Sequence, residues 1–413
     1  MGAYRDCKEV EADLLDLSGI VPFGAFVKDG TIIPGWTAVN TFSTPRPSLV
    51  AMQWLPVGNR VIAGTSDGKV LIGNPGEGQT LAVAYNDGDS FPFVFDTSES
   101  GLKVVLVSGK YYTSVAGDTV KHDYFLGGLT CGTMRCGRLF GASNSNGYTL
   151  KWSGLYGFTD WSDISESGSL TLDPYGGRIL NLVNFDDELV IFREGCIVRF
   201  AVAGDPYIFR VKDTIPVPPV TKNAQAITDD SILFFTASGL MRYRGGKVSR
   251  VEGAVTDDLN SVEATFVCLG RYVFFAGSSK SLGRKVVYVY DYLLDCYQLL
   301  DIPAYFISQD EKGVIAYTQT EIYRVKLRDE DALYSVRTPE IDFGSSKRKL
   351  LKELEVDCDD GVSVYVSNGV HTRKLPNPKG KNRLNMRGAK FRFIFEGGTA
   401  SVRAARVKAE VAK

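Results

Sequence analysis

Histidine and methionine are scarce in this sequence, which has only 2 His and 5 Met among 413 residues. His122 and His371 lie in unrelated regions, so Ser/His/Asp or Cys/His catalysis has little support, and each is expected to face solvent or lie in a turn. Cys131 and Cys136 could form half of a zinc site, but a structural zinc ion needs four ligands. We therefore expect no enzyme: no catalytic residue, no metal site and no cofactor.

A strong excess of one charge is also missing, since 47 Lys and Arg stand against 48 Asp and Glu. The whole chain thus lacks the charge of a general nucleic-acid binder. Neither a Walker loop nor a Gly-x-Gly-x-x-Gly motif after a strand occurs, which leaves no local candidate for binding nucleotide phosphates. No stretch approaches the ~18 consecutive apolar residues of a membrane span, and the N-terminus is too charged for a signal peptide. We expect no membrane span and synthesis in the cytoplasm.

The seven cysteines are odd in number, widely spread and mostly embedded in apolar runs, such as residues 265–269. A disulfide framework in a secreted protein shows a different pattern, with an even number of cysteines at short spacings. We interpret these residues as buried free thiols of a protein made in a reducing compartment.

Glycine and aromatic residues, by contrast, are abundant, with 43 Gly, 23 Phe and 20 Tyr. This mixture favours short strands joined by tight turns, so we expect an all-β protein. A turn, an apolar strand, a glycine turn and a second strand recur along the chain, as in Asp187–Phe200 and Asp230–Tyr243. The equivalent apolar positions are Val61, Val104, Leu139, Leu189, Ile232, Val273 and Val314. Their spacings of 43, 35, 50, 43, 41 and 41 residues average about 42, the period of a four-stranded propeller blade.

The repeat predicts a six- or seven-bladed β-propeller over residues 46–335, because each blade leaves two apolar faces that only its neighbours cover. Residues 1–45 are expected to form an N-terminal arm or ring-closing strands, and residues 336–413 a small basic β-sandwich module. Two segments, Lys8–Leu17 and Thr256–Glu263, have short helical patterns. A pair of β-sandwiches built from unrelated hairpins would show similar strand density but no higher period.

Adjacent aspartates are the first candidates for acid–base catalysis, at Asp186-Asp187, Asp229-Asp230, Asp257-Asp258 and Asp359-Asp360. Three of the four pairs directly precede an apolar strand, where Asp favours a turn by accepting hydrogen bonds from nearby backbone amides. We interpret them as turn residues. Residues 143–152 resemble the Asp-box of propeller glycosidases and sialidases only loosely, because the Asp is absent and Trp152 has the wrong spacing.

The C-terminal part of the chain is basic, with 16 Lys and Arg against 9 Asp and Glu from Glu340 to Lys413, a net charge of +7. Since the whole chain has a net charge of −1, residues 1–339 have a net charge of −8. This charge is typical of a solvated face, of a surface that docks an acidic partner, or of phosphate contact. Phosphate contact is the weakest of the three, since no aromatic residues are interleaved as a stacking platform. The candidate docking residues are Lys347, Arg348, Lys349, Lys381, Arg387 and Arg392.

One stretch resembles a known family: Arg138–Phe140, Lys151–Leu155, Phe158–Trp161, Gly168–Leu172, Ile179–Phe200 and Ile232–Tyr243. It is similar to the propeller of tailed-bacteriophage virion proteins, such as podovirus tail nozzles and hubs, which also carry a trailing β module. The resemblance implies a structural virion protein of a phage or prophage. It also implies a homo-oligomeric ring around the DNA exit channel, with other tail and portal proteins as partners. DNA would pass nearby without sequence-specific binding.

Two other functions stay open on the same residues. A glycan-binding or glycan-cleaving propeller would also explain the repeat and the surplus of aromatic residues. A cytoplasmic scaffold protein that binds peptides across its ring is the other.

Overall fold

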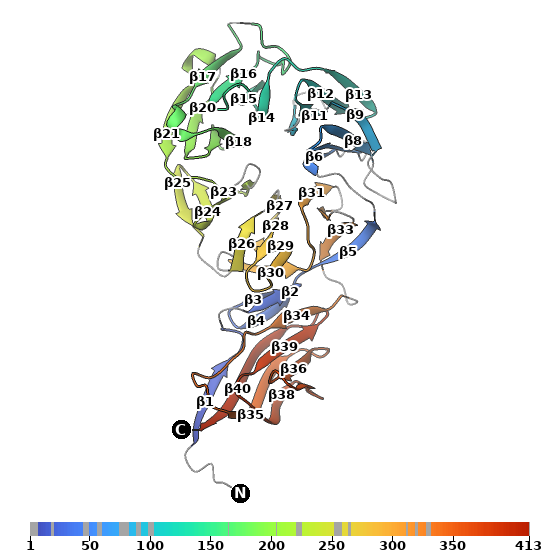
Figure 1. Cartoon of the computed structure of the whole chain (residues 1–413), viewed down its shortest axis with the longest axis vertical. Helices are drawn as coiled ribbons and strands as arrows, with labels where there is room; N and C mark the ends of the chain where they lie inside the picture. The colour runs from blue at the N-terminus through green and yellow to red at the C-terminus, as the bar shows by residue number, and fades with distance from the viewer. Residues whose placement is uncertain are drawn as a thin grey trace.

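Strands make up nearly all of the regular structure in the computed structural model (Figure 1). It describes residues 7–17, 20–43, 49–55, 60–73, 82–87, 92–97, 103–163, 165–203, 205–219, 225–251, 258–262, 266–310, 313–318, 321–327 and 332–412. Two 3-10 helices of three residues each, η1 (Pro174–Gly176) and η2 (Pro206–Ile208), lie between strands. The prediction of an all-β protein is confirmed.

Most strands belong to antiparallel sheets arranged around a common centre (Figure 1). The first three four-stranded sheets are β6 (Leu49–Leu55), β7 (Arg60–Thr65), β8 (Lys69–Gly73), β9 (Ala82–Asn86); β10 (Phe93–Asp96), β11 (Lys103–Ser108), β12 (Tyr111–Ala116), β13 (Thr119–Tyr124); and β14 (Leu129–Arg135), β15 (Arg138–Ser143), β16 (Thr149–Trp152), β17 (Gly168–Thr171). Two more follow: β18 (Ile179–Phe185), β19 (Glu188–Arg193), β20 (Ile197–Ala201), β21 (Arg210–Ile215); and β22 (Gln225–Ile227), β23 (Ile232–Thr236), β24 (Gly239–Arg244), β25 (Lys247–Arg250).

The circle continues with part of a larger sheet: β26 (Leu259–Val262), β27 (Val267–Leu269), β28 (Tyr272–Ser279), β29 (Arg284–Asp291) and β30 (Cys296–Leu300). Its last sheet contains β31 (Phe306–Asp310), β32 (Gly313–Tyr317), β33 (Glu321–Leu327) and β5 (Trp36–Ser43). Strand β5 lies antiparallel to β33, with Trp36 opposite Leu327 and Ser43 opposite Glu321. The sheet that completes the circle is thus built from chain segments almost 300 residues apart.

The seven apolar positions of the sequence repeat each lie in the second strand of a different sheet, and all seven are buried. A second strand is covered on both faces by adjacent sheets, so its central residues are apolar. In β19, for example, every residue is buried and Leu189–Phe192 are apolar. Because each sheet packs its faces against its neighbours, a separate apolar cluster lies between each pair of adjacent sheets.

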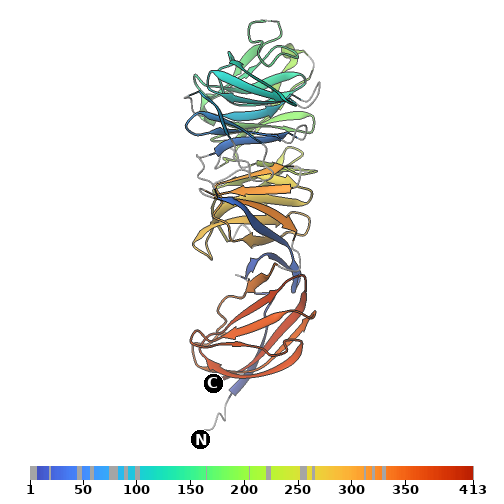
Figure 2. The same cartoon turned by 90° about the vertical axis from the view of Figure 1, so that its right-hand side faces the viewer.

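A separate module lies beside the circle (Figure 2). One of its sheets contains β1 (Cys7–Asp13), β3 (Ala25–Lys28), β4 (Thr31–Pro34), β40 (Val402–Ala412), β35 (Lys349–Cys358) and β38 (Gly380–Gly388). The other contains β2 (Val21–Phe23), β34 (Tyr334–Arg337), β39 (Arg392–Gly397), β36 (Ser363–Ser367) and β37 (Thr372–Lys374). The two sheets share one core, which includes Leu351 and Val407 from the first and Phe393 and Val364 from the second.

Strand β2 joins this module to the circle. Phe23 pairs in parallel with Leu299 of β30 and in antiparallel fashion with Ser335 of β34. A single hydrogen-bonded sheet therefore runs from β26 in the circle to β37 in the module.

The helix predicted for Lys8–Leu17 is wrong, because residues 7–13 form strand β1, which pairs with β40. Val10 and Ala12 pack against the core of the module, while Glu11 forms an ion pair with Lys408 at 2.8 Å. This alternation has the period of two that a strand requires. In the second predicted helix, residues 259–262 form β26, whereas 256–257 and 263 lie outside the described residues.

Candidate protein-docking surfaces

Two turns with the same Asp-Pro-Tyr sequence present exposed tyrosines. In each, the aspartate side chain accepts a hydrogen bond from the tyrosine N–H: Asp173 from Tyr175 at 3.0 Å, and Asp205 from Tyr207 at 2.9 Å. Proline fixes the φ angle of the first helical position, so both turns are preorganised as η1 and η2. Tyr175 is 98% exposed and Tyr207 is 84% exposed.

The two turns are anchored from below by buried side chains. The guanidinium group of Arg193 donates to the Asp173 carbonyl at 2.5 Å and to the Gly177 carbonyl at 2.8 Å. Phe209, directly after η2, packs on Trp152 with ring centroids 5.4 Å apart. Both tyrosines are therefore held on rigid supports even though their rings face solvent.

Tyr175 and Tyr207 lie at opposite ends of the strands. The η1 turn precedes β18, and Gly176 O accepts from Gly195 N in the β19–β20 turn. Strand β20 then runs from that end to the other, where η2 follows it. The circle of sheets thus carries a rigid, exposed tyrosine on each of its two faces.

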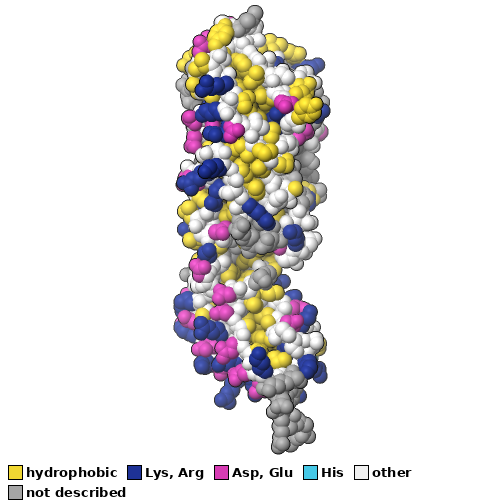
Figure 3. Space-filling model, turned by 90° about the vertical axis from the view of Figure 1, so that its left-hand side faces the viewer, with side chains coloured by type: hydrophobic (Ala, Val, Ile, Leu, Met, Phe, Trp, Pro, Cys, Tyr) yellow, Lys and Arg dark blue, Asp and Glu magenta, His cyan; other side chains and the backbone are white. Residues whose placement is uncertain are grey.

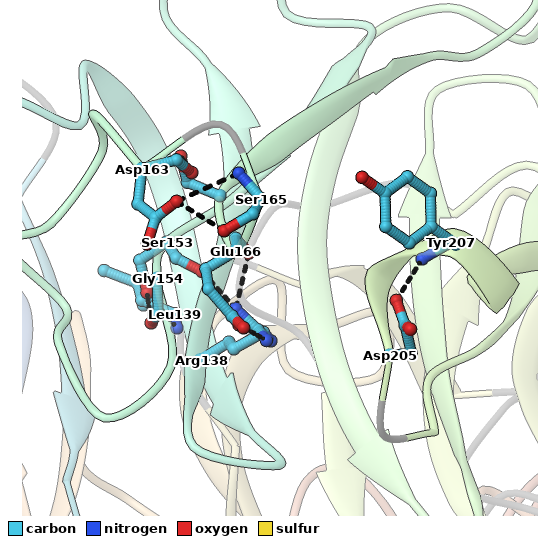
Figure 4. A network of polar contacts seen from close by, with 10 residues as sticks. Arg138, Leu139, Ser153, Gly154, Asp163, Ser165, Glu166, Asp205 and Tyr207 are labelled. Atoms are coloured by element: carbon cyan, nitrogen blue, oxygen red, sulfur yellow. Dashed lines mark hydrogen bonds and ion pairs between the residues drawn. The ribbon is translucent and has the colours of Figure 1, made fainter.

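The face with Tyr207 also holds a long loop, residues 153–167, organised by buried Arg138 (Figure 4). The Arg138 guanidinium donates to Ser153 O at 3.2 Å, to Glu166 O and to the Glu166 carboxylate. Asp163 accepts from the Ser165 side chain and backbone, and these bonds hold its pKa below the usual value. Hydrogen bonds thus hold the described residues of this loop, 153–163 and 165–167, on Arg138, and Asp163 is kept ionised.

We call the surface formed by the β14–β15, β16–β17, β18–β19 and β20–β21 connections the loop face. Tyr156 N donates to Gly137 O at 2.7 Å, and the guanidinium of Arg135 donates to Asp186 O at 3.3 Å, which ties these connections together. Its exposed apolar side chains are Leu155, Tyr156, Tyr207 and Ile208. Its carboxylates are Asp160, Asp163, Glu166, Asp186, Asp187 and Asp205, while no Lys or Arg occurs in the described residues of the four connections.

Buried Glu188 lies under this face. Its carboxylate accepts from Arg199 Nε at 3.0 Å and from the Tyr243 hydroxyl of the next sheet. Burial opposes ionisation of Glu188, but the hydrogen bonds from Arg199 and Tyr243 outweigh it and hold the pKa below its ordinary value. Burial, together with the bond to Glu188, raises the pKa of Tyr243. This is a charged, hydrogen-bonded link between two sheets, in which Glu188 and Tyr243 are buried and Arg199 is partly exposed.

His122 is not a solvent-facing or turn residue as expected. Its ring on β13 stacks on Tyr85 of β9, with centroids 3.9 Å apart, and lies 5.3 Å from the ring of Tyr111. Nδ1 is 2.9 Å from Thr113 Oγ1, and Nε2 is 3.4 Å from Asp87 Oδ1. This Asp-His-Thr order superficially resembles a hydrolytic triad, but the Thr113 hydroxyl is fully buried and inaccessible to a substrate. The cluster links two sheets.

His371 is exposed beside the β36–β37 turn, as expected.

Four of the six candidate docking residues come together at one end of the module, which we call the basic end. Its connections are residues 342–348, 368–371 and 389–391; Lys349 lies opposite Gly388, and Asn368 Nδ2 donates to Arg387 O at 2.9 Å. Exposed Lys347, Arg348, Arg387 and Arg392 lie here with Lys390. Figure 3 shows Lys and Arg side chains interspersed with Asp and Glu over the module at the lower end of the molecule.

The other two candidate residues are placed differently. Lys349 is buried, and its ammonium group donates to the carbonyls of Ser345, Lys347 and Ala389, the last at 2.6 Å. Burial lowers the pKa of Lys349. It holds the turns of the basic end together and is not available to a partner, which corrects its inclusion among the docking residues. Lys381 lies opposite Glu355, six residues along β35 from Lys349 or about 20 Å away, and pairs with Glu353 at 3.8 Å.

The aspartate pairs occupy turns or caps rather than a shared site. Asp186 and Asp187 are exposed in the β18–β19 turn, where Asp186 has a φ of 50°. Asp258 is buried and accepts from the Ser279 and Tyr288 hydroxyls, while Asp257 lies outside the described residues. Across the described residues, no group of three or more His, Cys, Asp or Glu could hold a metal ion, and no helix is long and apolar enough to cross a membrane.

The cysteines differ in exposure. Among the described side chains, Cys131, Cys196, Cys296 and Cys358 are buried and form no disulfide, as expected, whereas Cys268 is half-buried. Cys136 is exposed, in the β14–β15 turn with a φ of 48°, and therefore departs from the expectation. Burial raises the pKa of Cys268 to about 11, so this thiol is not a ready nucleophile at neutral pH.

Comparison with known proteins shows the fold. No protein-family model and no curated protein matches the chain. Solved structures do match: virginiamycin B lyase from Staphylococcus aureus is 12% identical, covers 71% of this chain and 99% of its own, and has a TM-score of 0.50. A streptogramin B lyase is 12% identical, covers 71% of this chain and 98% of its own, and has a TM-score of 0.52. The WD40 β-propeller domain of Doa1 is 14% identical, covers 70% of this chain and 97% of its own, and has a TM-score of 0.48. The chain has a β-propeller-like fold.

The exposed tyrosines were not among the predicted docking residues. The signal that could have identified them is the repeated tripeptide Asp-Pro-Tyr, at 173–175 and 205–207. An aspartate followed by proline predicts a capped turn, and a large aromatic residue just after it then has no strand neighbour to cover it.

Proposed function

We propose that this protein is a structural component of a larger assembly, built as a seven-bladed β-propeller with a C-terminal β-sandwich. It acts by protein–protein docking, as a tail nozzle or hub protein of a phage or prophage virion. The seven sheets around the centre, with β5 closing the last, support this blade count. The shared core of the two module sheets supports the sandwich.

The observation that carries the docking role is the pair of rigid, exposed tyrosines, Tyr175 and Tyr207. Tyrosine supplies a large contact area at low entropic cost and is enriched among the residues that dominate binding energy at interfaces. A capped turn that already fixes the backbone of the tyrosine lowers that cost further. Since one tyrosine stands on each face, a neighbour is expected on both sides of the propeller.

The place in a virion rests on the resemblance of residues 138–243 to tailed-phage propellers. The solved lyases match at 12% identity, so their activity is not carried over to this chain.

The test is to express the tagged chain in cells producing the phage particles and to follow it into purified virions by immunoblot and negative-stain imaging. We expect incorporation, and loss of incorporation in the Tyr175→Ala/Tyr207→Ala variant while the purified variant keeps its melting temperature. Tyr148→Ala, a partly buried tyrosine in the β15–β16 turn, is the matched control. A chain that stays monomeric and is absent from virions contradicts the proposal.

A glycan-binding propeller is the second candidate, because the exposed rings of Tyr156 and Tyr207 beside carboxylates also suit stacking on a sugar. Glycan-array screening and a fluorogenic glycoside assay separate the two functions. Binding that is lost in Tyr207→Ala would favour the glycan function over docking.

A further inference from the structure

The loop face carries an excess of carboxylates next to apolar side chains. Its four connections hold six carboxylates and no Lys or Arg among their described residues, and Tyr156, 75% exposed, stands beside them. Two of the six are paired with cations of the adjoining strands, Glu166 with Arg138 and Asp187 with Lys212. Hydrogen bonds from Ser165 lower the pKa of Asp163, and the bond from Lys212 lowers that of Asp187. A partner of this face must therefore present cations and an apolar contact.

The basic end offers this combination. Lys347 and Arg348 are exposed, and no carboxylate of the described residues lies within 4.0 Å of either charge. Lys390 and Arg392 share one carboxylate, that of Glu340, at 3.4 and 3.8 Å. Between them the β36–β37 turn presents Val370, which is 81% exposed. Lys349 fixes this surface from below, through three backbone carbonyls.

The two surfaces cannot meet within one chain. The sheets β14–β17 and β18–β21 lie at the end of the molecule farthest from the module (Figure 1). The basic end of one copy can reach the loop face only of another copy. Such a contact uses different surfaces on the two partners, so it closes into a ring or continues as a filament.

Resting on the proposed structural role, we infer that copies of this chain associate head to tail, with the basic end of one copy docked on the loop face of the next. Lys347 and Arg348 face Asp160 and Asp187, and Val370 contacts the apolar side chains Tyr156 and Tyr207.

Nucleic acid is the less suitable occupant of the basic end, because Glu340 already neutralises part of its charge and no exposed aromatic ring lies there to stack on bases.

The experiment measures self-association of the purified full chain by mass photometry and analytical ultracentrifugation at 50 and 500 mM salt. We expect wild-type association that weakens with salt. Lys347→Glu/Arg348→Glu reverses the basic end, and Asp160→Lys/Asp187→Lys reverses the loop face. Each variant alone should associate at least tenfold more weakly than wild type, because like charges then oppose each other across the contact.

Mixing the two variants provides the decisive measurement. One retains an intact loop face and the other an intact basic end, and the two reversed surfaces are again opposite in charge, so the mixture should recover the association that each variant alone has lost. Lys247→Glu/Arg250→Glu, two exposed positions on β25, makes the same change in charge and should associate like wild type. A mixture that stays monomeric, or single variants that associate like wild type, would overturn the inference.

A gel-shift titration with a DNA duplex of random sequence tests whether nucleic acid binds the basic end instead. DNA binding that is lost in Lys347→Glu/Arg348→Glu while self-association is unchanged would overturn the inference. Failure of the head-to-tail contact leaves virion incorporation and its dependence on Tyr175 and Tyr207 as a separate result, so the two proposals fail independently.

Discussion

The side chain of Gln298 is hydrogen-bonded to both backbone groups of Trp36. Oε1 accepts from Trp36 N at 2.7 Å, and Nε2 donates to Trp36 O at 2.9 Å. Gln298 is fully buried on β30, and Trp36 begins β5, so this pair fixes the ring-closing strand to the neighbouring sheet. A Cβ at Gly35 would lie 1.7 Å from Gln298 Oε1, so only glycine leaves room for the amide.

Gln298→Ala should lower the free energy of unfolding by about 3 kcal/mol, since two buried backbone groups lose their partners. Urea denaturation followed by tryptophan fluorescence measures this loss. Gln309→Ala, at an exposed position on β31, is the control and should change stability by less than about 0.5 kcal/mol. Equal stability of the two variants would show that the amide does not hold β5.

Val325→Asp should prevent ring closure, because Val325 of β33 is buried opposite Ala38 of β5 and a charge there has no partner. We expect a loss of several kcal/mol or failure to fold, seen as a lower melting temperature and protease cleavage within residues 36–43. Leu327→Asp, on the same strand but 62% exposed, should fold normally. Similar cleavage of both variants would contradict the closing role of β5.

Acid should weaken the propeller through Glu188. Its folded pKa lies below the ordinary value, so ionised Glu188 contributes stability that is fully present above its unfolded pKa near 4.5 and is lost as the pH falls through the folded value. Glu188→Gln should therefore be less stable than wild type at pH 7, and the difference should shrink as the pH falls below 4.5. Urea midpoints across this range measure the effect. Asp187→Asn, in an exposed ion pair, should show a smaller difference.

Arg138→Met should loosen the loop of residues 153–167, because the carbonyls of Ser153 and Glu166 lose their donor. Amide hydrogen exchange in this loop should become at least tenfold faster, while exchange in β19 stays unchanged. Arg138→Lys should not rescue it, since one ammonium cannot reproduce the planar fork of the guanidinium. Normal exchange in Arg138→Met would show that the loop is held by other contacts.

The part of the fold that could be predicted is the part that repeats. The second strand of each sheet is covered on both faces, so residues such as Leu189 and Ile232 lie in apolar runs that recur about every 42 residues. Strand β1 was mistaken for a helix because the residues that pair with it, near Lys408, are about 400 positions away. A local pattern cannot reveal such a partner.

The docking surfaces could be predicted only in part. The excess of basic residues identified the module, but the sequence could not separate exposed Lys347 from buried Lys349 two positions later. That difference depends on where the carbonyls of Ser345 and Ala389 meet, which is a property of the folded turns. The loop face was missed because its carboxylates come from three connections, spread from Asp160 to Asp205.

The pairing of β1 with β40 has a consequence for biosynthesis. At about 5 to 20 residues per second, a ribosome needs roughly 20 to 80 s to make β40 after β1 has been translated. During that time β1 is an unpaired strand, and β5 is unpaired until β33 has been made, so other chains could capture either strand. The alternating charges of β1 protect it in this interval, and the propeller can close only after translation has passed β33.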